Sequence, residues 1–562
     1  MSRSRIRTLL CSLLLSIPLL VPRLQAARAM VVSAHPLASE VGLQVIAEGG
    51  SAADAAVAAL CVLNVVEPHA SGLGGGGFAL WRGANGYPEC IDYREVAPAG
   101  LDTTVYYDPA DSLHLARIGG GPTVGVPATA LGLHRLWQRH GRLPISRLLQ
   151  PAIDLARRGY PVSEALATQI TEHMEGILED EQLSTLFLMD GLPPSPGDTL
   201  HNEPLALVFE DLVRQGLDSF PASQGAALAA TVQAAGGWIT AADLENYQVL
   251  IREPLRSSYR GMELLSPPPP ATGGLALMEC LNILEPVDLN SLDEVQWRHL
   301  FCEAHKKAAR DRSARAGDPA FYTTPLDSLL DKTLARRVLD QIHPDGVHGT
   351  WPALGSQSYG ERAASLPVHG EVFPPKDHGN TTHISIWDEQ GNLLSLTQSI
   401  NYFFGSGLIV NGYLLNNQMS DFSFETDDPL NRPAPGKRPR SSMAPLIGLR
   451  EGQPVLCLGT PGGPRIPGAM EQILINHIDF GMSLQQAIDA PRMHPMGLTL
   501  VHETRLAPEL IAALADLGYK PYPYGDFNSY FGGAHGIARA ADGTLEGGAD
   551  PRRGGQVAGY DR

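Results

Sequence analysis

The clearest alternation of apolar and polar positions lies on either side of residue 390. Residues 381–388 and 393–401 each alternate apolar and polar side chains, which is typical of a half-buried strand. Only Glu389-Gln390-Gly391 separates them, and a three-residue hairpin loop commonly ends in a left-handed conformation that suits glycine. The sequence therefore predicts a β-hairpin with Gly391 at the end of its turn.

The same alternation predicts how the two strands pair. One face of the hairpin becomes Ile/Leu and the other hydroxyl-rich, and a slip of one residue would place the isoleucines opposite the polar set. The expected register pairs Trp387 with Leu393, Ile386 with Leu394, Ser385 with Ser395, Ile384 with Leu396, His383 with Thr397 and Thr381 with Ser399. Asn401 lies nearby. Taken alone, the hairpin also fits ordinary strand composition, since threonine favours strands.

Helical periodicity dominates the first two-thirds of the chain. It predicts helices over 51–68, 127–140, 146–158, 203–215, 224–235, 273–285 and 295–311, and a later apolar helix over 466–479. Short strands are expected at 78–82, 89–94 and 455–458. Residues 343–379 are rich in Gly, Pro, Ser and His, have weak periodicity, and are the best candidate for a mobile segment. That segment ends directly before Asn380.

A glycine-rich stretch follows the first predicted helix. Gly72-Leu73-Gly74-Gly75-Gly76-Gly77 contains the G-x-G-x-x-G spacing of dinucleotide-binding loops, but a helix precedes it and no Lys-Ser/Thr pair follows. Nucleotide binding is therefore not expected. The glycines instead indicate tight turns or a close approach of two backbone segments.

Length and charge narrow the classes of protein. A chain of 562 residues suggests two to four core-sized units, although large sandwiches depart from that rule. Lys and Arg number 42 against 60 Asp and Glu, a net charge of −18, which argues against nucleic acid as a partner.

The N-terminus has the pattern of a secretory signal. Arg3, Arg5 and Arg7 precede an apolar run over 9–21, and small residues at 24–26 and 27–29 offer cleavage positions. A membrane anchor is the weaker alternative, because the run is shorter than the roughly 20 residues that span a bilayer and Pro18 interrupts it. With 1–29 as signal peptide, and no later apolar run of spanning length, we expect a periplasmic or secreted protein.

The cysteines indicate neither a metal site nor a disulfide framework. Cys11 leaves with the signal, and the remaining five cannot all pair: Cys61, Cys90, Cys280, Cys302 and Cys457. No spacing matches a zinc site or a redox motif. Cys61 and Cys457 lie in apolar runs and are expected to pack as small hydrophobes, while one disulfide elsewhere stays open.

Several motifs together resemble the γ-glutamyltranspeptidase family over residues 30–562. They occur in the family's order: 72–77, Asp92-Tyr93-Arg94-Glu95, the proline run 267–270, Asn380-Thr381-Thr382-His383, Asn416-Asn417-Gln418, Ser441-Ser442-Met443 and Pro461-Gly462-Gly463. The resemblance implies an α+β fold, a four-layer αββα sandwich of the N-terminal nucleophile hydrolase type with a helix-rich N-terminal portion. It also implies autocatalytic cleavage between Asn380 and Thr381 into a heavy subunit, 30–380, and a light subunit, 381–562.

The resemblance also implies a role for each site residue. Thr381 would be the nucleophile and its freed α-amino group, whose ordinary pKa of roughly 7.7–8.0 lies near neutrality, the base that a weakly nucleophilic hydroxyl needs. Ser399 stands where the family often has threonine and keeps the hydroxyl. The amides of Gly462 and Gly463 would form the oxyanion hole. The substrate's α-carboxylate would meet Arg94, Ser441 and Ser442, and its α-ammonium would meet Asn401, Gln418 and Asp421.

The implied activity is that of a γ-glutamyltransferase and glutathione hydrolase. Such an enzyme cleaves γ-glutamyl amides such as glutathione through a γ-glutamyl-threonine ester that water or an amine resolves, with no metal or organic cofactor. The span from Asp421 to Ser441 is shorter than in members with a lid loop, which implies an open site that admits bulky donors and water. Two alternatives stay open: a glutaryl or cephalosporin acylase on the same fold, and an uncleaved, inactive binding homologue.

Overall fold

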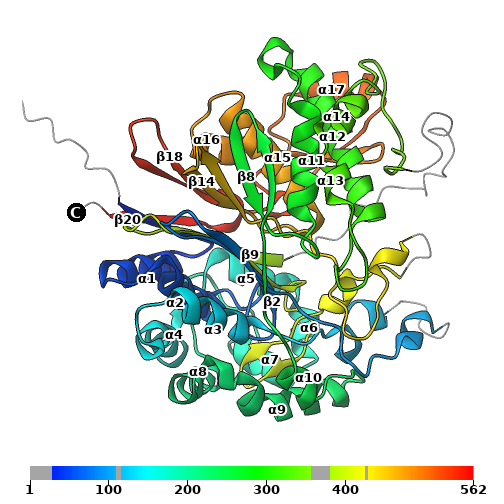
Figure 1. Cartoon of the computed structure of the whole chain (residues 1–562). Coiled ribbons are helices and arrows are strands. Elements are labelled where there is room, and N and C mark those ends of the chain that lie inside the picture. The colour runs from blue at the N-terminus through cyan, green and yellow to red at the C-terminus, as the bar shows by residue number, and fades with distance from the viewer. Residues whose placement is uncertain (1–27, 109–114, 356–379, 425–427, 561–562) are drawn as a thin grey trace, which may run out of the picture.

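Two stacked antiparallel β-sheets form the centre of the molecule (Figure 1). The computed structural model describes residues 28–108, 115–355, 380–424 and 428–560. The first sheet has the order β20 (Gln556–Tyr560), β1 (Ala29–Ser33), β9 (Asn380–Trp387), β10 (Leu393–Asn401), β2 (Gly76–Arg82), β3 (Pro88–Tyr93) and β6 (Leu250–Arg252). The second has the order β19 (Leu545–Ala549), β18 (His535–Arg539), β14 (Gln453–Gly459), β13 (Leu446–Arg450), β8 (Met262–Ser266) and β7 (Leu255–Tyr259).

The two sheets bury their facing sides against each other. Alternate residues of each strand point into this layer, as the two-residue period of a strand requires. Its core includes Phe78, Leu80, Trp387, Ile447, Cys457 and Ile537. Cys457 thus packs as the small hydrophobe that its apolar run predicts, and the five described cysteines are all free and buried.

Helices cover the outer face of each sheet and complete four layers (Figure 1). On the first sheet lie α1 (Pro36–Ala47), α2 (Ala52–Val66) and α3 (Thr129–His140). Behind them, α4 (Ile145–Arg158) packs on α2, α8 (Glu203–Gln215) packs on α4, and α9 (Phe220–Ala234) lies farther from the sheet. On the second lie α11 (Gly273–Leu284), α12 (Glu294–Arg315), α15 (Ile466–Ile478) and α16 (Leu484–Asp489). The expected αββα sandwich of the α+β class is confirmed.

Shorter elements fill the connections and the periphery. The helices are α5 (Glu164–Glu172), α6 (Met174–Leu178), α7 (Glu181–Phe187), α10 (Ala241–Glu245), α13 (Leu326–Leu329), α14 (Lys332–Leu339) and α17 (Pro508–Asp516). The strands are β4 (Tyr160–Pro161), β5 (Thr199–Leu200), β11 (Ile409–Val410), β12 (Tyr413–Leu414), β15 (Met493–Met496), β16 (Thr499–His502) and β17 (Lys520–Pro523).

The predicted helices are all present, with shifts at their ends. Ser51 caps α2 through a reciprocal pair of hydrogen bonds with Asp54, a capping box. The helix predicted at 224–235 begins four residues earlier, at Phe220, because Pro221 fits the first turn of a helix, where its missing N–H has no partner to lose.

The glycine-rich stretch provides close backbone approach rather than a nucleotide loop. Gly76 and Gly77 already belong to β2. A Cβ placed on Gly75 would lie 2.2 Å from the carbonyl oxygen of Ser399, and one on Gly74 would lie 2.1 Å from that of Leu414. Only glycine lets this segment pass so close to β10 and to the chain after it.

The hairpin of β9 and β10 has the predicted register over most of its length. The pairs from Trp387 with Leu393 to His383 with Thr397 are confirmed, and Gly391 has the expected left-handed conformation, with φ 86°. The expected direct pairing of Thr381 with Ser399 is wrong. The ladder continues with Thr382 opposite Gln398 and then shifts, so that Asn401 stands opposite Asn380 and a β-bulge intervenes.

Strands from both predicted subunits interleave in both sheets. β9 and β10, from the predicted light part, lie between β1 and β2 of the heavy part, and β13 pairs with β8 across the same division. Ladder hydrogen bonds would therefore hold the two parts together after a cut before Thr381.

The segments expected to be mobile or removed lie largely outside the described residues. Residues 356–379 and most of the predicted signal, 1–27, are not among them, whereas Ala29 is the first residue of β1. Residues 343–355 contain no helix or strand, yet Trp351 is only 3% exposed and its indole N–H donates to Glu303 at 2.9 Å. Within the described ranges, no helix has the length and apolar character needed to cross a membrane.

Candidate active site

A chain of hydroxyl groups reaches the predicted cleavage bond. The hydroxyl of Thr381 donates to Ser399 Oγ at 3.3 Å, and the hydroxyl of Ser399 donates to the carbonyl oxygen of Asn380 at 2.5 Å. The backbone N–H of Asn401 also donates to Ser399 Oγ, at 2.6 Å, because the β-bulge turns it toward that side chain. Although Thr381 and Ser399 are not ladder partners, the bulge keeps their hydroxyls in contact.

The side chain of Asn380 is held on the opposite face of β9. Its Oδ1 accepts from the N–H of Thr381 at 3.0 Å and from Arg553 Nη1 at 2.5 Å. Its Nδ2 donates to the carbonyl oxygen of His69 at 3.0 Å. The peptide that joins Asn380 to Thr381 is therefore oriented by contacts on both sides of the strand.

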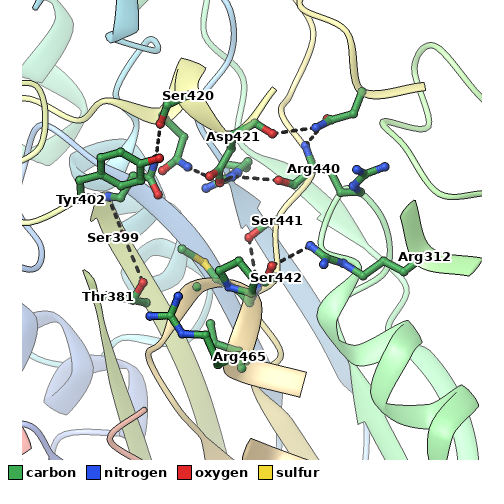
Figure 2. A pocket seen from close by; sticks show the side chains of 18 residues that line it. Arg312, Thr381, Ser399, Tyr402, Ser420, Asp421, Arg440, Ser441, Ser442 and Arg465 are labelled. Atoms are coloured by element: carbon green, nitrogen blue, oxygen red, sulfur yellow. Dashed lines mark hydrogen bonds and ion pairs between the residues drawn. The ribbon is translucent and has the colours of Figure 1, made fainter. Parts of the chain in front are cut away.

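Thr381 opens into a cavity of about 360 Å³ that gathers nine of the ten predicted catalytic and binding residues (Figure 2). The tenth, Gly462, directly precedes a lining residue. The wall consists of Arg94, Arg312, Thr381, Ser399, Asn401, Tyr402, Gln418, Ser420, Asp421, Asn431, Arg440, Ser441, Ser442, Met443, Gly463, Pro464, Arg465 and Ile466.

The single carboxylate of this wall already has partners. Asp421 Oδ2 lies 2.6 Å from Arg94 Nη2 and accepts from Gln418 Nε2, also at 2.6 Å. Arg94 is buried, whereas the Asp421 side chain is 31% exposed. Gln418 Oε1 is buried without a donor from any residue in the described ranges. Arg94, expected to bind the α-carboxylate, thus contacts Asp421, expected to bind the α-ammonium, and the acceptor groups of Asp421 and Gln418 lie side by side.

The second serine of the Ser441-Ser442 pair contacts an arginine that the sequence did not single out. Arg312 Nη2 donates to Ser442 Oγ at 2.6 Å (Figure 2). Its Nε donates to Thr272 Oγ1 at 2.7 Å. Arg312 has no ion-pair partner among the described residues, and burial lowers its pKa to about 9, so it stays charged at neutral pH. It comes from α12, 130 residues before Ser442, and no local pattern indicated the contact.

Further lining residues were also missed. Arg440 directly precedes the serine pair and could have been suspected, but its charge is balanced by Asp428 at 2.5 Å. Ser420 accepts from Asn401 Nδ2 at 2.8 Å. Asn401 itself has φ 79°, an unusual conformation that asparagine tolerates better than most residues.

The Gly462-Gly463 turn has a backbone conformation that favours glycine. Both glycines have positive φ, 130° and 54°, which side chains with a Cβ rarely adopt. The turn leads through a short helical turn at Gly463–Arg465 into α15, so its amides stand at the start of a helix, where N–H groups lack internal partners. Their role as oxyanion donors stays a prediction.

No group of three or more His, Cys, Asp or Glu side chains in the described part of the chain is arranged to hold a metal ion.

Known proteins resemble this chain in sequence and in fold. The family profile described as gamma-glutamyltranspeptidase matches residues 38–560. The chain is 36% identical over 542 residues to the glutathione hydrolase proenzyme of Bacillus subtilis (strain 168), covering 94% of this chain and 91% of that protein. It is 37% identical over 536 residues to the acylase ACY 1 proenzyme of Pseudomonas sp. (strain SE83), covering 93% and 92%.

A solved structure extends the likeness to the fold. The cephalosporin acylase of Bacillus halodurans superposes with a TM-score of 0.85 at 27% identity, covering 96% of this chain and 97% of that one. Hydrolases and acylases therefore both stand among the relatives. With the family profile matched over nearly the whole described chain, the protein belongs to the γ-glutamyltranspeptidase family and has its N-terminal nucleophile hydrolase fold.

Proposed function

We propose that the chain is a proenzyme cut between Asn380 and Thr381, and that the mature enzyme cleaves γ-glutamyl amides such as glutathione. Residues 30–380 form the heavy subunit and 381–562 the light subunit. Thr381 attacks the γ-carbonyl, forms a γ-glutamyl ester, and passes the acyl group to water or an amine. The proenzyme names of the Bacillus and Pseudomonas relatives support the maturation step.

The hydroxyl chain supplies a route for the cut. Thr381 Oγ adds to the carbonyl carbon of Asn380 while Ser399 donates to the carbonyl oxygen, on which negative charge develops. The C–N bond then breaks with a proton passing to the Thr381 nitrogen, leaving an ester. Breaking that bond frees the α-amino group of Thr381, and water then hydrolyses the ester, releasing the carboxylate of Asn380 and restoring the Thr381 hydroxyl. The freed α-amino group acts as the base for that hydroxyl.

The hydrogen-bond acceptors of Asp421 and Gln418 are the observation that favours a γ-glutamyl substrate. Asp421 is partly exposed to the cavity, and Gln418 Oε1 beside it has no donor among the described residues. An α-ammonium group would supply donors to both, whereas a glutaryl group has none to offer. In this proposal Arg94 and the serine pair, which line the same cavity, receive the α-carboxylate.

A glutaryl or cephalosporin acylase is the second candidate, and the Arg94–Asp421 ion pair favours it. If Asp421 serves only to balance Arg94, Arg312, which has no ion-pair partner in the described ranges, leaves a positive charge in the wall that suits a carboxylate without an ammonium. The acylase relatives support this alternative.

Two measurements on the purified protein decide among the alternatives. Denaturing gels with N-terminal sequencing should show two fragments, the smaller starting at Thr381, and Thr381→Ala should remain one chain while Thr381→Ser is cut. Release of 4-nitroaniline from the γ-glutamyl and the glutaryl anilide is then compared. A higher kcat/KM for the glutaryl anilide would replace the proposed activity with the acylase one, and an uncut, inactive chain would identify a binding homologue.

We also propose that the protein acts outside the cytoplasm, from the Arg-rich start and apolar run at 3–21. Fractionation of producing cells should recover the activity in the periplasm or the medium, and recovery in the cytoplasm would contradict export.

A further inference from the structure

A second cavity, of about 480 Å³, lies on the face of β9 that carries the side chain of Asn380. Side chains of a strand alternate between its two faces, so Thr381 lines the first cavity and Asn380 lines this rear cavity. Most of the rear wall comes from the chain after α2, from α5, and from residues within 524–529 and 551–554. The bond expected to be cut therefore lies between two cavities.

One carboxylate of the rear wall is hydrogen-bonded to β9. Glu67 directly follows α2, and its Oε2 accepts from the hydroxyl of Thr382 at 2.8 Å. Its other oxygen, Oε1, has no hydrogen bond to any residue in the described ranges. Glu67 is 9% exposed and lines the rear cavity. The carboxylate is thus held beside the cut by one oxygen and keeps the other for a water molecule.

The surroundings of Glu67 allow it to take up a proton near neutral pH. Burial raises its pKa from 4.5 to about 7, although the Thr382 hydroxyl and the positive charge of Arg553 oppose this shift. A base works best when its pKa lies near the pH at which it operates. Burial lowers the pKa of His69 to about 3, so this imidazole is neutral. The other charged residues of the wall are three exposed acids and a buried arginine that is paired with Glu503 and Asp550: Glu164, Glu172, Asp526 and Arg552.

Hydrolysis of the ester between Asn380 and Thr381 requires a water molecule and a base that takes one of its protons. The hydroxyl of Thr381 approaches the carbonyl carbon of Asn380 from the face of β9 that borders the first cavity. A peptide plane in a strand lies roughly within the sheet, so the opposite face of that carbon is turned toward the rear cavity. In the first cavity, the only carboxylate among the described lining residues is Asp421, which is paired with Arg94. A base for the water is therefore available on the rear side.

We propose that Glu67 is the base for the water that hydrolyses the ester of Asn380 with Thr381, and that the rear cavity supplies this water. The inference rests on the proposed maturation and assigns its second half to a residue that the first cavity does not contain.

Each bond and proton of the step has a defined course. Glu67 takes one proton from the water, and the hydroxide oxygen adds to the carbonyl carbon of Asn380, whose oxygen receives the hydrogen bond of Ser399. The bond from that carbon to Thr381 Oγ then breaks, and a proton passes from the new carboxyl group to Thr381 Oγ. Asn380 is left as a carboxylate, Thr381 regains its hydroxyl, and Glu67 releases its proton to the solvent.

The test separates the two halves of maturation with hydroxylamine, which splits an ester at neutral pH and leaves ordinary amide bonds intact. Full-length precursors are made by cell-free synthesis, treated with or without hydroxylamine before denaturation, and followed on gels. Glu67→Gln keeps an acceptor for the Thr382 hydroxyl but cannot take a proton. Without hydroxylamine it should be split roughly 10²-fold more slowly than the unmodified chain, the usual effect of losing a general base.

Hydroxylamine should restore the splitting of Glu67→Gln, because it bypasses the water and its base. The heavy fragment should then carry a hydroxamate on Asn380, which mass spectrometry identifies. Thr381→Ala cannot form the ester and should not be split under either condition, which controls for cleavage elsewhere. Glu172→Gln, an exposed acid of the same wall, is the matched control and should mature at the normal rate without hydroxylamine.

A pH series adds a readout that a purely structural role would not move. Splitting of the unmodified chain should accelerate as the pH rises through about 7, where Glu67 loses its proton. In Glu67→Gln this acceleration should be absent.

The outcomes separate this inference from the proposed maturation. Glu67→Gln split at the unmodified rate in plain buffer overturns the role of Glu67 and assigns the base to the freed α-amino group of Thr381. A Glu67→Gln chain that hydroxylamine does not split has lost ester formation, which also overturns it. An unmodified chain that is never split before Thr381, even with hydroxylamine, overturns the maturation itself.

Discussion

Replacing Ser399 by alanine should slow maturation without unfolding the protein. The hydroxyl of Ser399 donates to the carbonyl oxygen of Asn380 at 2.5 Å and accepts from Thr381 Oγ1 at 3.3 Å. The variant therefore loses the donor that faces the developing oxyanion. It also leaves the N–H of Asn401 without its 2.6 Å acceptor.

The size of the effect follows from these contacts. Loss of one oxyanion donor costs about 3 to 4 kcal/mol in acyl-transfer enzymes, or roughly 10²- to 10³-fold in rate. The unpaired N–H of Asn401 lowers the free energy of unfolding by about 1 to 3 kcal/mol, which a chain of this size should tolerate. Ser399→Thr keeps the hydroxyl and should restore cleavage.

The assay follows the purified precursor over time on denaturing gels and fits the first-order conversion to two fragments. Ser395→Ala is the matched control, because Ser395 lies on the same strand and its hydroxyl also makes buried hydrogen bonds, to the carbonyl of Leu458 and from the N–H of Leu446, both at 3.0 Å. That variant should lose stability and still be cut at the normal rate. A Ser399→Ala precursor cut as fast as the unmodified chain would refute the proposed hydroxyl chain.

Three further predictions concern substrate, stability and pH. Asp421→Asn should lower kcat/KM for γ-glutamyl donors by roughly 30- to 5000-fold, the equivalent of about 2 to 5 kcal/mol, without preventing the cut before Thr381; an unimpaired rate would favour the acylase. Lys307→Met leaves the buried carboxylate of Asp311 without its ion-pair partner and should lower the free energy of unfolding, measured in urea, by about 3 to 5 kcal/mol. A decrease of less than about 1 kcal/mol would contradict the importance of this ion pair. Burial raises the pKa of Glu67 from 4.5 to about 7 in the folded chain, so the stability that its proton provides is complete below pH 4.5 and is lost as the pH rises through 7. The urea midpoint of Glu67→Gln minus that of the unmodified protein should therefore increase from pH 5 to pH 8. An equal difference at the two pH values would count against that shift.

The sequence predicted the helices and the hairpin because they depend on interactions between residues close together in the chain. The alternation in 381–401 determined the hairpin and its register down to His383 with Thr397, since side chains of a strand alternate between two faces. Ser51 and Asp54 determined the start of α2 for an equally local reason, a cap made within one turn. The order of the motifs indicated the family, and the resemblance identified half of the residues that line the cavity.

Tertiary structure alone decided which of these residues meet and how. The β-bulge before Asn401 arises where β10 must also pair with β2, so the alternation could not indicate it. The ion pair of Arg94 with Asp421 joins residues 327 positions apart, and no periodicity relates them. Arg312 enters the site because α12 packs over the second sheet beside Ser442. Sequence patterns report contacts within a turn or a hairpin, whereas the charges of this cavity come from separate layers of the sandwich that only folding brings together.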